Sequence, residues 1–145
     1  MIPLSCGKIR EIQEVLRRVA CEYSLMPATA LVVDDHPTFR RFARKLLESA
    51  GLFVVGDAPD GASALSAVRE LRPDVVLLDV LLPDTTGFEV ARALAAEPAR
   101  PLVVLTSSRS AADLGGLPVR EGVAGFIAKS ELTVATLTAL LGEGA

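Results

Sequence analysis

The stretch PDVVLLDVLLPDTTG, Pro73–Gly87, places one carboxylate inside an otherwise apolar run. Asp79 follows four apolar residues, Val75 to Leu78, and three more apolar residues come directly after it. An unpaired charge is costly to bury, so a group in this position usually pairs, binds a metal or changes its protonation state. The pattern therefore predicts that Asp79 ends a buried strand and belongs to a site that uses its carboxylate.

Four other short apolar runs share the Val- and Leu-rich composition of this strand. The five predicted strands are Ala30–Asp34, Leu52–Gly56, Asp74–Asp79, Pro101–Thr106 and Gly125–Lys129. Most of them do not alternate polar with apolar residues, which is typical of strands covered on both faces in a parallel sheet. Helical patterns lie between them, beginning after Pro37, at Asp60-Gly61 and near Thr86-Gly87, with a last one over Leu132–Leu141. The alternation predicts an α/β fold built as a doubly wound, five-stranded parallel sheet.

The composition excludes several classes of protein. A chain of 145 residues, 50% hydrophobic and 23% charged, has the size and composition of a folded domain. Its apolar runs are shorter than the roughly 18–20 residues that cross a membrane, and its net charge of −3 includes no basic block suited to nucleic acid. The first residues lack the order of a signal peptide, so a cytoplasmic location is expected. Cys6 and Cys21, with a single histidine in the chain, cannot complete a four-ligand zinc site and are expected to be reduced thiols.

Residues 1–27 are predicted to form a helical extension, separate from a domain over residues 28–145. Apolar side chains repeat there in steps of three and four, at Ile9, Ile12, Leu16, Val19 and Tyr23. The seam is too short to indicate a coiled coil. A docking helix, an upstream segment before an alternative start at Met26, and a dimerisation helix that would make a homodimer all stay open.

Polar side chains recur at the ends of the predicted strands. Asp34-Asp35 ends the first, Asp79 the third, Thr106 the fourth and Lys129 the fifth. Parallel strands bring these ends to one edge, where such sheets bind ligands. Carboxylates forced together repel unless a cation intervenes, and Mg²⁺ favours such oxygen ligands. A lysine and a hydroxyl suit a transferred phosphoryl group.

Each of these residues also has a simpler interpretation. Asp34 and Asp35 could cap the following helix, and Lys129 could be a surface lysine. Thr106, which precedes Ser107 and Ser108, could belong to a loop or a cap. Asp79 lies too far before the next helix to cap it. The coincidence of all of them at strand ends favours a site.

Four segments in chain order resemble the receiver domain of bacterial two-component response regulators, over about Ala28–Leu141. They are VVDDHP (Val32–Pro37), LLDVLLPDTTG (Leu77–Gly87), VVLTSS (Val103–Ser108) and GFIAKSEL (Gly125–Leu132). The resemblance implies a flavodoxin-like strand order, 2-1-3-4-5. It also implies a phosphorelay signalling module rather than a metabolic enzyme. Such a module catalyses only its own phosphorylation and dephosphorylation. Its partners would be a sensor histidine kinase or phosphotransfer protein and a downstream protein, with no direct contact to nucleic acid or membrane.

The resemblance assigns roles at the predicted site. Asp79 would be the nucleophile that accepts a phosphoryl group from a phosphohistidine. Asp35 would bind Mg²⁺ directly and Asp34 mainly through water, with the backbone carbonyl of Leu81 as a further ligand. These roles agree with the charges that the strand ends bring together.

The resemblance also implies a conformational switch. Thr106 and Lys129 would contact the phosphoryl oxygens, and Phe126 matches the family's switch aromatic. Movement of Thr106 toward the phosphoryl group and of Phe126 inward would alter the surface of the fourth helix, fifth strand and fifth helix. Leu81 and Ser108 occupy positions that influence water access, and Leu81 is expected to slow hydrolysis.

The sequence departs from the family's pattern in two places. Gly115-Gly116 and Pro118 predict a short or broken fourth helix, since both residue types disfavour a helix interior. Ser130 follows Lys129, where many receivers have a proline after a cis bond, so the loop is expected to differ in shape.

Several alternatives stay open. The chain could be the severed receiver of a longer helix-turn-helix regulator, or a degenerate receiver that serves as a docking scaffold. A haloacid-dehalogenase-type phosphatase also uses an aspartyl phosphate, but it needs Asp-x-Asp where this chain has Asp34-Asp35-His36. A nucleotide binder is disfavoured, because neither a P-loop nor G-x-G-x-x-G follows the first strand.

Overall fold

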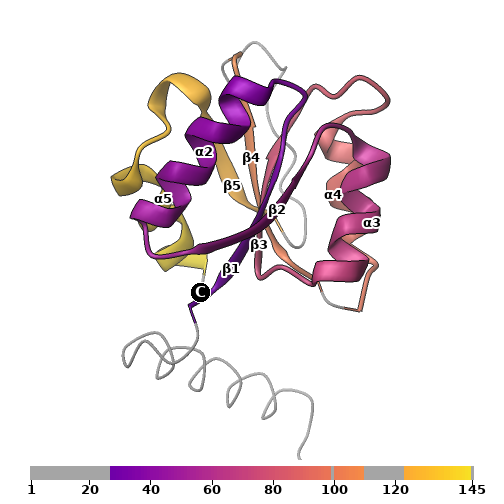
Figure 1. The fold of residues 1–145 in the computed structure, drawn as a ribbon, viewed down its shortest axis with the longest axis horizontal. Helices are drawn as coiled ribbons and strands as arrows, with labels where there is room; N and C mark the ends of the chain where they lie inside the picture. The colour runs from indigo at the N-terminus through magenta and orange to yellow at the C-terminus, as the bar shows by residue number, and fades with distance from the viewer. Residues whose placement is uncertain (1–26, 99, 110–122, 145) are drawn as a thin grey trace, which may run out of the picture.

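The computed structural model describes residues 27–98, 100–109 and 123–144, which form a five-stranded sheet with helices on both faces (Figure 1). The strands are β1 (Thr29–Val33), β2 (Phe53–Ala58), β3 (Val75–Asp79), β4 (Leu102–Ser107) and β5 (Val123–Ala128). The helices are α2 (Pro37–Ser49), α3 (Gly61–Leu71), α4 (Gly87–Ala95) and α5 (Val134–Gly144), with a 3₁₀ turn over Lys129–Glu131. All neighbouring strands are parallel, in the order β2-β1-β3-β4-β5, which confirms the predicted fold.

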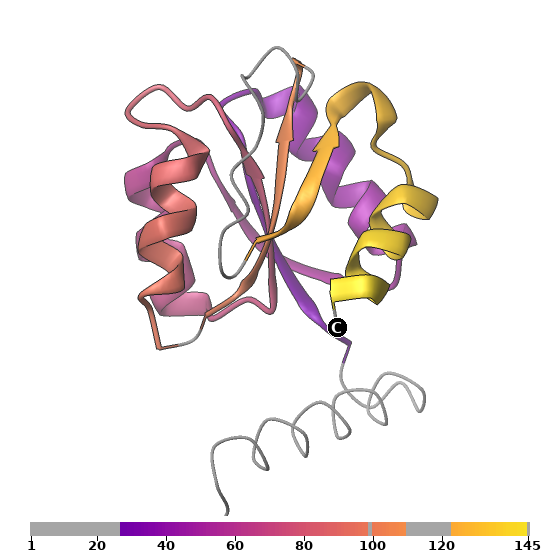
Figure 2. The same cartoon turned by 180° about the vertical axis from the view of Figure 1, so that it is seen from behind.

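Two apolar layers bury the two faces of the sheet. Helices α2 and α5 cover one face, and α3 and α4 cover the other (Figures 1 and 2). In β1, Ala30 and Val32 join the layer under α2 and α5, whereas Leu31 and Val33 join the layer under α3 and α4. Because both faces are covered, the central strands β1, β3 and β4 are apolar except at their ends, as the sequence indicated.

A proline marks the start of one helix, and polar caps mark the starts of two others. Pro37 occupies the first turn of α2, the Asp60 carboxylate accepts the Ser63 N–H at the start of α3, and the Thr86 hydroxyl accepts the Glu89 N–H at the start of α4. These three predicted starts are confirmed.

Three predicted limits were wrong by about two residues. Helix α5 starts at Val134, not Leu132, because the Thr133 hydroxyl accepts the Thr136 N–H and so caps the helix. Strand β2 extends to Ala58 and β5 begins at Val123, because both continue pairing with their neighbours beyond the predicted runs. The predicted N-terminal helix and broken fourth helix lie outside the described residues. Within the described ranges, no helix is long and apolar enough to cross a membrane.

Gly87 allows α4 to start directly against the end of β3. A Cβ atom there would lie 2.4 Å from the carbonyl oxygen of Asp79 and 2.9 Å from Cα of Val80. The Gly87 N–H also donates to the Val80 carbonyl, at 2.7 Å. Only glycine permits this approach, which fixes the backbone on either side of Asp79.

We expect Gly87→Ala to lower the free energy of unfolding by about 1–3 kcal/mol, because the added methyl meets backbone that cannot move aside cheaply. Urea denaturation measures the change. Gly142→Ala is the matched control, since Gly142 lies in α5 with no atom within 4 Å of an added Cβ, and its stability should be unchanged or slightly raised. A Gly87 variant as stable as the parent would contradict this account of the packing.

Candidate functional site

Strand alternation sends three polar side chains to the same face of the sheet. Asp34, Asp79 and Thr106 each lie two residues beyond a member of the apolar layer under α2 and α5. Those members are Val32, Leu77 and Val104. Since residues two apart in a strand share a face, the three polar groups meet at one edge, where the strand carboxyl ends lie.

Lys129 joins two of these residues from the end of β5. Its Nζ lies 2.6 Å from Oδ2 of Asp34 and 3.4 Å from Oδ2 of Asp79. Asp34 is fully buried, Asp79 is 4% exposed, and the Lys129 side chain is 17% exposed. The interpretation of Lys129 as a surface lysine is therefore wrong.

Asp34 and Asp35 do not cap α2. The N-cap residue of α2 is His36, and no side chain caps it through a hydrogen bond. Instead, Oδ1 of Asp34 accepts the His36 backbone N–H, at 2.8 Å. The Asp35 side chain is 36% exposed and lies at the mouth of the site.

Thr106 is part of β4 rather than of a loop, and it pairs in register with Asp79. It is fully buried, and its Oγ1 has no hydrogen-bond partner within the described part of the chain. A buried hydroxyl left without a partner costs about 1–3 kcal/mol. Beside Asp79, the Thr106 hydroxyl could donate a hydrogen bond to a ligand at this edge of the sheet.

Helix α2 and its N-cap residue contribute three site residues that sequence reasoning missed. Nδ1 of His36 lies 3.1 Å from Oδ1 of Asp34 and 3.0 Å from Oδ1 of Asp35. Lys129 Nζ lies 4.2 Å from the centroid of the Phe39 ring. Arg40 Nη1 donates to the backbone carbonyl of Asp34, at 2.7 Å.

Only His36 carried a sequence signal, its place directly after the two acids. The roles of Phe39 and Arg40 depend on how α2 packs over the strand ends, which a helical repeat does not specify.

The two buried acids have opposite pKa shifts. Burial raises the pKa of Asp79 to about 6; the charge of Asp34 adds to this, and Lys129 opposes it. Burial would also raise the pKa of Asp34, but the Lys129 ammonium and the His36 N–H outweigh it and bring that pKa below its usual value. Lys129 therefore compensates Asp34 more fully than Asp79.

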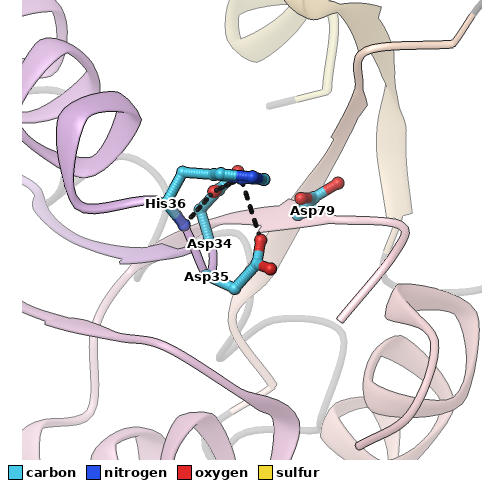
Figure 3. Close-up of side chains that lie close together, drawn as sticks. All are labelled: Asp34, Asp35, His36 and Asp79. Carbon is cyan, nitrogen blue, oxygen red and sulfur yellow. Dashed lines mark hydrogen bonds and ion pairs between the residues drawn. The ribbon is translucent and has the colours of Figure 1, made fainter. Parts of the chain in front are cut away.

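The donor set fits a hard divalent cation. Asp34, Asp35, His36 and Asp79 offer ligand atoms that all lie within 4.8 Å of one another (Figure 3). When the three carboxylates are ionised, the single ammonium of Lys129 leaves an uncompensated negative charge, which a cation such as Mg²⁺ would balance. Leu81 N–H donates to Oδ1 of Asp79 at 3.3 Å, so its backbone lies beside the cluster; a ligand role for its carbonyl stays a prediction.

The loop after β3 is tied to a neighbouring helix through Asp84. Its carboxylate accepts the backbone N–H groups of Gly61, at 2.8 Å, and Ala62, at 3.0 Å, in the first turn of α3. These bonds lower the pKa of Asp84. They hold the loop that carries Leu81 at the edge of the site.

Phe126 lies on the other face of the sheet. It is half-buried and packs against the layer under α3 and α4, whereas Thr106 lies on the α2 and α5 side. Within the described residues, the paired strands β4 and β5 provide a backbone route between the two. The switch role of both residues stays a prediction.

We expect Asp79→Asn to raise the stability of the metal-free protein at neutral pH. The pKa of Asp79 is about 6 in the folded protein against 3.8 as the ordinary value, so ionisation of this group disfavours folding. Its destabilising effect is absent below pH 4, grows as the pH rises from about 4 to 6, and stays constant above, where it amounts to at most about 3 kcal/mol. Urea denaturation in EDTA from pH 4 to 8 measures the difference between variant and parent.

Glu70→Gln, which removes an exposed charge on α3, is the control and should show no comparable dependence on pH. A gain for Asp79→Asn that is equal at pH 4 and pH 8 would show that ionisation of Asp79 is not its cause.

Comparisons with known proteins identify the same architecture. The family model described as "Response regulator receiver domain" matches residues 30–141. A CheY-like receiver domain from Methylobacillus flagellatus superposes with a TM-score of 0.70 at 25% identity, over 83% of this chain and 100% of that one. A LuxR-family two-component response regulator from Aurantimonas superposes with a TM-score of 0.66 at 30% identity, over 81% of this chain and 87% of that one.

Curated relatives are longer than this chain. It is 51% identical over 83 residues to protein-glutamate methylesterase/protein-glutamine glutaminase 5 of Myxococcus xanthus, with 57% of this chain and 24% of that protein aligned. It is 44% identical over 84 residues to the DNA-binding response regulator MtrA of Mycolicibacterium smegmatis, with 58% of this chain and 36% of that protein aligned. The chain thus spans about a quarter to a third of these relatives. Because the family model covers most of it, the chain belongs to the response regulator receiver domains, the receiving modules of two-component signalling.

Proposed function

We propose that this receiver accepts a phosphoryl group on Asp79 from the phosphohistidine of a sensor histidine kinase or phosphotransfer protein. The observation that supports this most directly is the position of Lys129 Nζ, 2.6 Å from Asp34 and 3.4 Å from Asp79. An ammonium in this position could pair with an oxygen of a phosphoryl group attached to Asp79. The unpartnered hydroxyl of Thr106, on the neighbouring strand, is a second donor for such an oxygen.

The proposed step exchanges one bond for another. A carboxylate oxygen of Asp79 bonds to phosphorus while the P–N bond to the donor imidazole breaks, and the electron pair returns to that nitrogen. Hydrolysis later breaks the acyl phosphate with water and restores the carboxylate. Such transfers need positioning and charge neutralisation more than covalent chemistry from the protein, and Lys129 and Thr106 would supply both.

Mg²⁺ is the cofactor that the proposal includes. Asp35 and Asp79 would hold the ion directly, together with the Leu81 carbonyl, and Asp34 mainly through water. Asp34 is already paired with the Lys129 ammonium, whereas Asp35 lies nearer the solvent. This difference supports direct binding by Asp35 and water-mediated binding by Asp34. When bound, Mg²⁺ neutralises charge on the phosphoryl oxygens.

The product of the reaction would be an altered surface rather than a released metabolite. Thr106 and Phe126 would report phosphorylation to a downstream protein, and the chemistry of the domain itself would be limited to its own phosphorylation and hydrolysis. The proposal retains residues 1–27 as an extension, residues 28–145 as the receiver and the cytoplasm as its location. A homodimer through the extension stays one of its alternatives.

A receiver that belongs to a longer helix-turn-helix regulator is the second candidate. The limited share of its curated relatives that the chain covers, and the printed description of one of them as a DNA-binding response regulator, favour this alternative. The phosphoryl chemistry would be the same in both cases. A haloacid-dehalogenase-type phosphatase would instead need Asp34 as nucleophile, although Asp34 is buried in an ion pair with Lys129.

Incubation with acetyl phosphate and Mg²⁺ should add one phosphoryl group, detected by intact mass. Asp79→Asn should abolish the addition, because it removes the nucleophile, while Glu70→Gln should retain it. Omission of Mg²⁺ with EDTA should reduce the rate strongly, by at least about tenfold, since the carboxylates would then repel the incoming phosphate. Steady release of phosphate, with the phosphoryl group on Asp34 rather than Asp79, would identify a phosphatase instead and overturn the proposal.

Leu81→Asn should shorten the lifetime of the phosphorylated state by roughly severalfold. Leu81 is 46% exposed beside Asp79, so an amide in its place could orient a water for attack on phosphorus. The loss of the added mass over time measures the effect. Phe53→Asn is the control, because Phe53 is an exposed apolar residue at the opposite end of the sheet. A Leu81 variant that loses the group no faster than the parent would refute this role.

A further inference from the structure

His36 is the one residue of the acidic cluster that the proposed function leaves without a role. We infer that its Nδ1 is a ligand to the bound metal, so that this site favours Mn²⁺ over Mg²⁺ by more than its carboxylates alone would. The inference rests on the proposed function, because it concerns the identity of the ion beside Asp79.

The distances around His36 match the geometry of a six-coordinate ion. In an octahedral shell with bonds of about 2.1 Å, adjacent ligand atoms are about 3.0 Å apart. Nδ1 of His36 lies 3.0 Å from Oδ1 of Asp35, which is a proposed direct ligand. It also lies 3.1 Å from Oδ1 of Asp34, the acid that is proposed to hold the ion mainly through water. Figure 3 shows the imidazole turned toward both acids, with the Asp79 carboxylate on the adjoining strand. Opposite ligands in such a shell are about 4.2 Å apart, so the 4.8 Å spread of the cluster needs only small side-chain shifts.

The backbone holds His36 in this position before any ion binds. Its N–H donates to Oδ1 of Asp34, at 2.8 Å. Pro37 restricts the preceding residue to extended conformations, and His36 has φ −96° and ψ 113°, within that region. The ring is thus directed by the start of α2, although the side chain is 68% exposed and open to an ion from solvent.

A second observation, independent of the acids, points to a place for a ligand at this edge. Thr106 is fully buried, its hydroxyl lacks a partner within the described residues, and it shares a face of the sheet with Asp79. On the opposite side, Lys129 occupies Oδ2 of Asp34. Because Oδ1 of Asp34 accepts the His36 backbone N–H, the half-exposed carboxylate of Asp35 is the more open acid for direct binding of a cation beside His36.

An imidazole changes which ion such a site prefers. Mg²⁺ favours oxygen ligands and retains its waters, whereas first-row transition ions bind imidazole nitrogen well. Three carboxylates alone suit both Mg²⁺ and Mn²⁺. A nitrogen ligand in place of one water shifts the balance toward Mn²⁺.

Mn²⁺ is the probe that tests this inference. His36 is the only histidine in the chain, so a tag-free protein has one source of imidazole nitrogen. Mn²⁺ also avoids the two cysteines, which would compete for softer ions. Electron spin echo measurements on the Mn²⁺-loaded protein should show modulation from a directly bound ¹⁴N, and His36→Phe should abolish it. Mn²⁺ titration followed by magnetic resonance, with Mg²⁺ as competitor, gives the ratio of the two affinities.

We expect His36→Phe to lower the preference for Mn²⁺ over Mg²⁺ by about tenfold. Asp35→Asn is the matched comparison, because it removes an oxygen ligand and should weaken both ions together. No ¹⁴N modulation in the wild-type protein, or the same ratio in the His36 variant, would overturn the inference. Phosphorylation of the wild-type protein by acetyl phosphate with Mg²⁺ is measured separately, so that a failed inference is distinguished from a failed phosphoacceptor site.

Discussion

The ammonium of Lys129 makes it possible to bury Asp34 and Asp79 at one edge of a parallel sheet. Removing one partner of a buried ion pair leaves an uncompensated charge, which is strongly destabilising. Here one ammonium serves two buried carboxylates, and a third, Asp35, lies beside them. Burial raises the pKa of Asp79 to about 6, because the ammonium that it shares with Asp34 only partly offsets the cost of burying its charge. The negative charge that remains when all three acids are ionised is one that a cation could balance.

The rest of the fold holds this arrangement in place. Register within the sheet sets Thr106 beside Asp79, and the lack of a side chain at Gly87 lets α4 start against the same strand end. Asp84 fixes the intervening loop to the first turn of α3 through two backbone N–H groups. These contacts involve backbone groups or short side chains. They therefore fix the backbone on either side of Asp79.

Local sequence patterns were enough to predict the strands, three of the helix starts and the residues at the strand ends. Each depends on neighbours in the chain: an apolar run, a proline in a first turn, or a polar residue after the last apolar one. Phe39 and Arg40 could not be predicted in this way, because their contacts with Lys129 and Asp34 depend on how α2 packs over the sheet. The missing partner of the Thr106 hydroxyl is likewise a property of the folded state alone.

The two faces of the sheet separate the charged groups from Phe126, the residue proposed to report phosphorylation. The charged groups lie on the side of α2 and α5, whereas Phe126 packs on the side of α3 and α4. A new charge on Asp79 would act first on Thr106 and Lys129, which are the donors within its reach. Since Thr106 pairs with Ile127, next to Phe126, a shift of the Thr106 backbone would move the β5 segment that carries the aromatic ring. Transmission through strand register requires only that β4 and β5 move together, and their regular pairing from Val104 with Gly125 to Ser107 with Ala128 favours such joint movement.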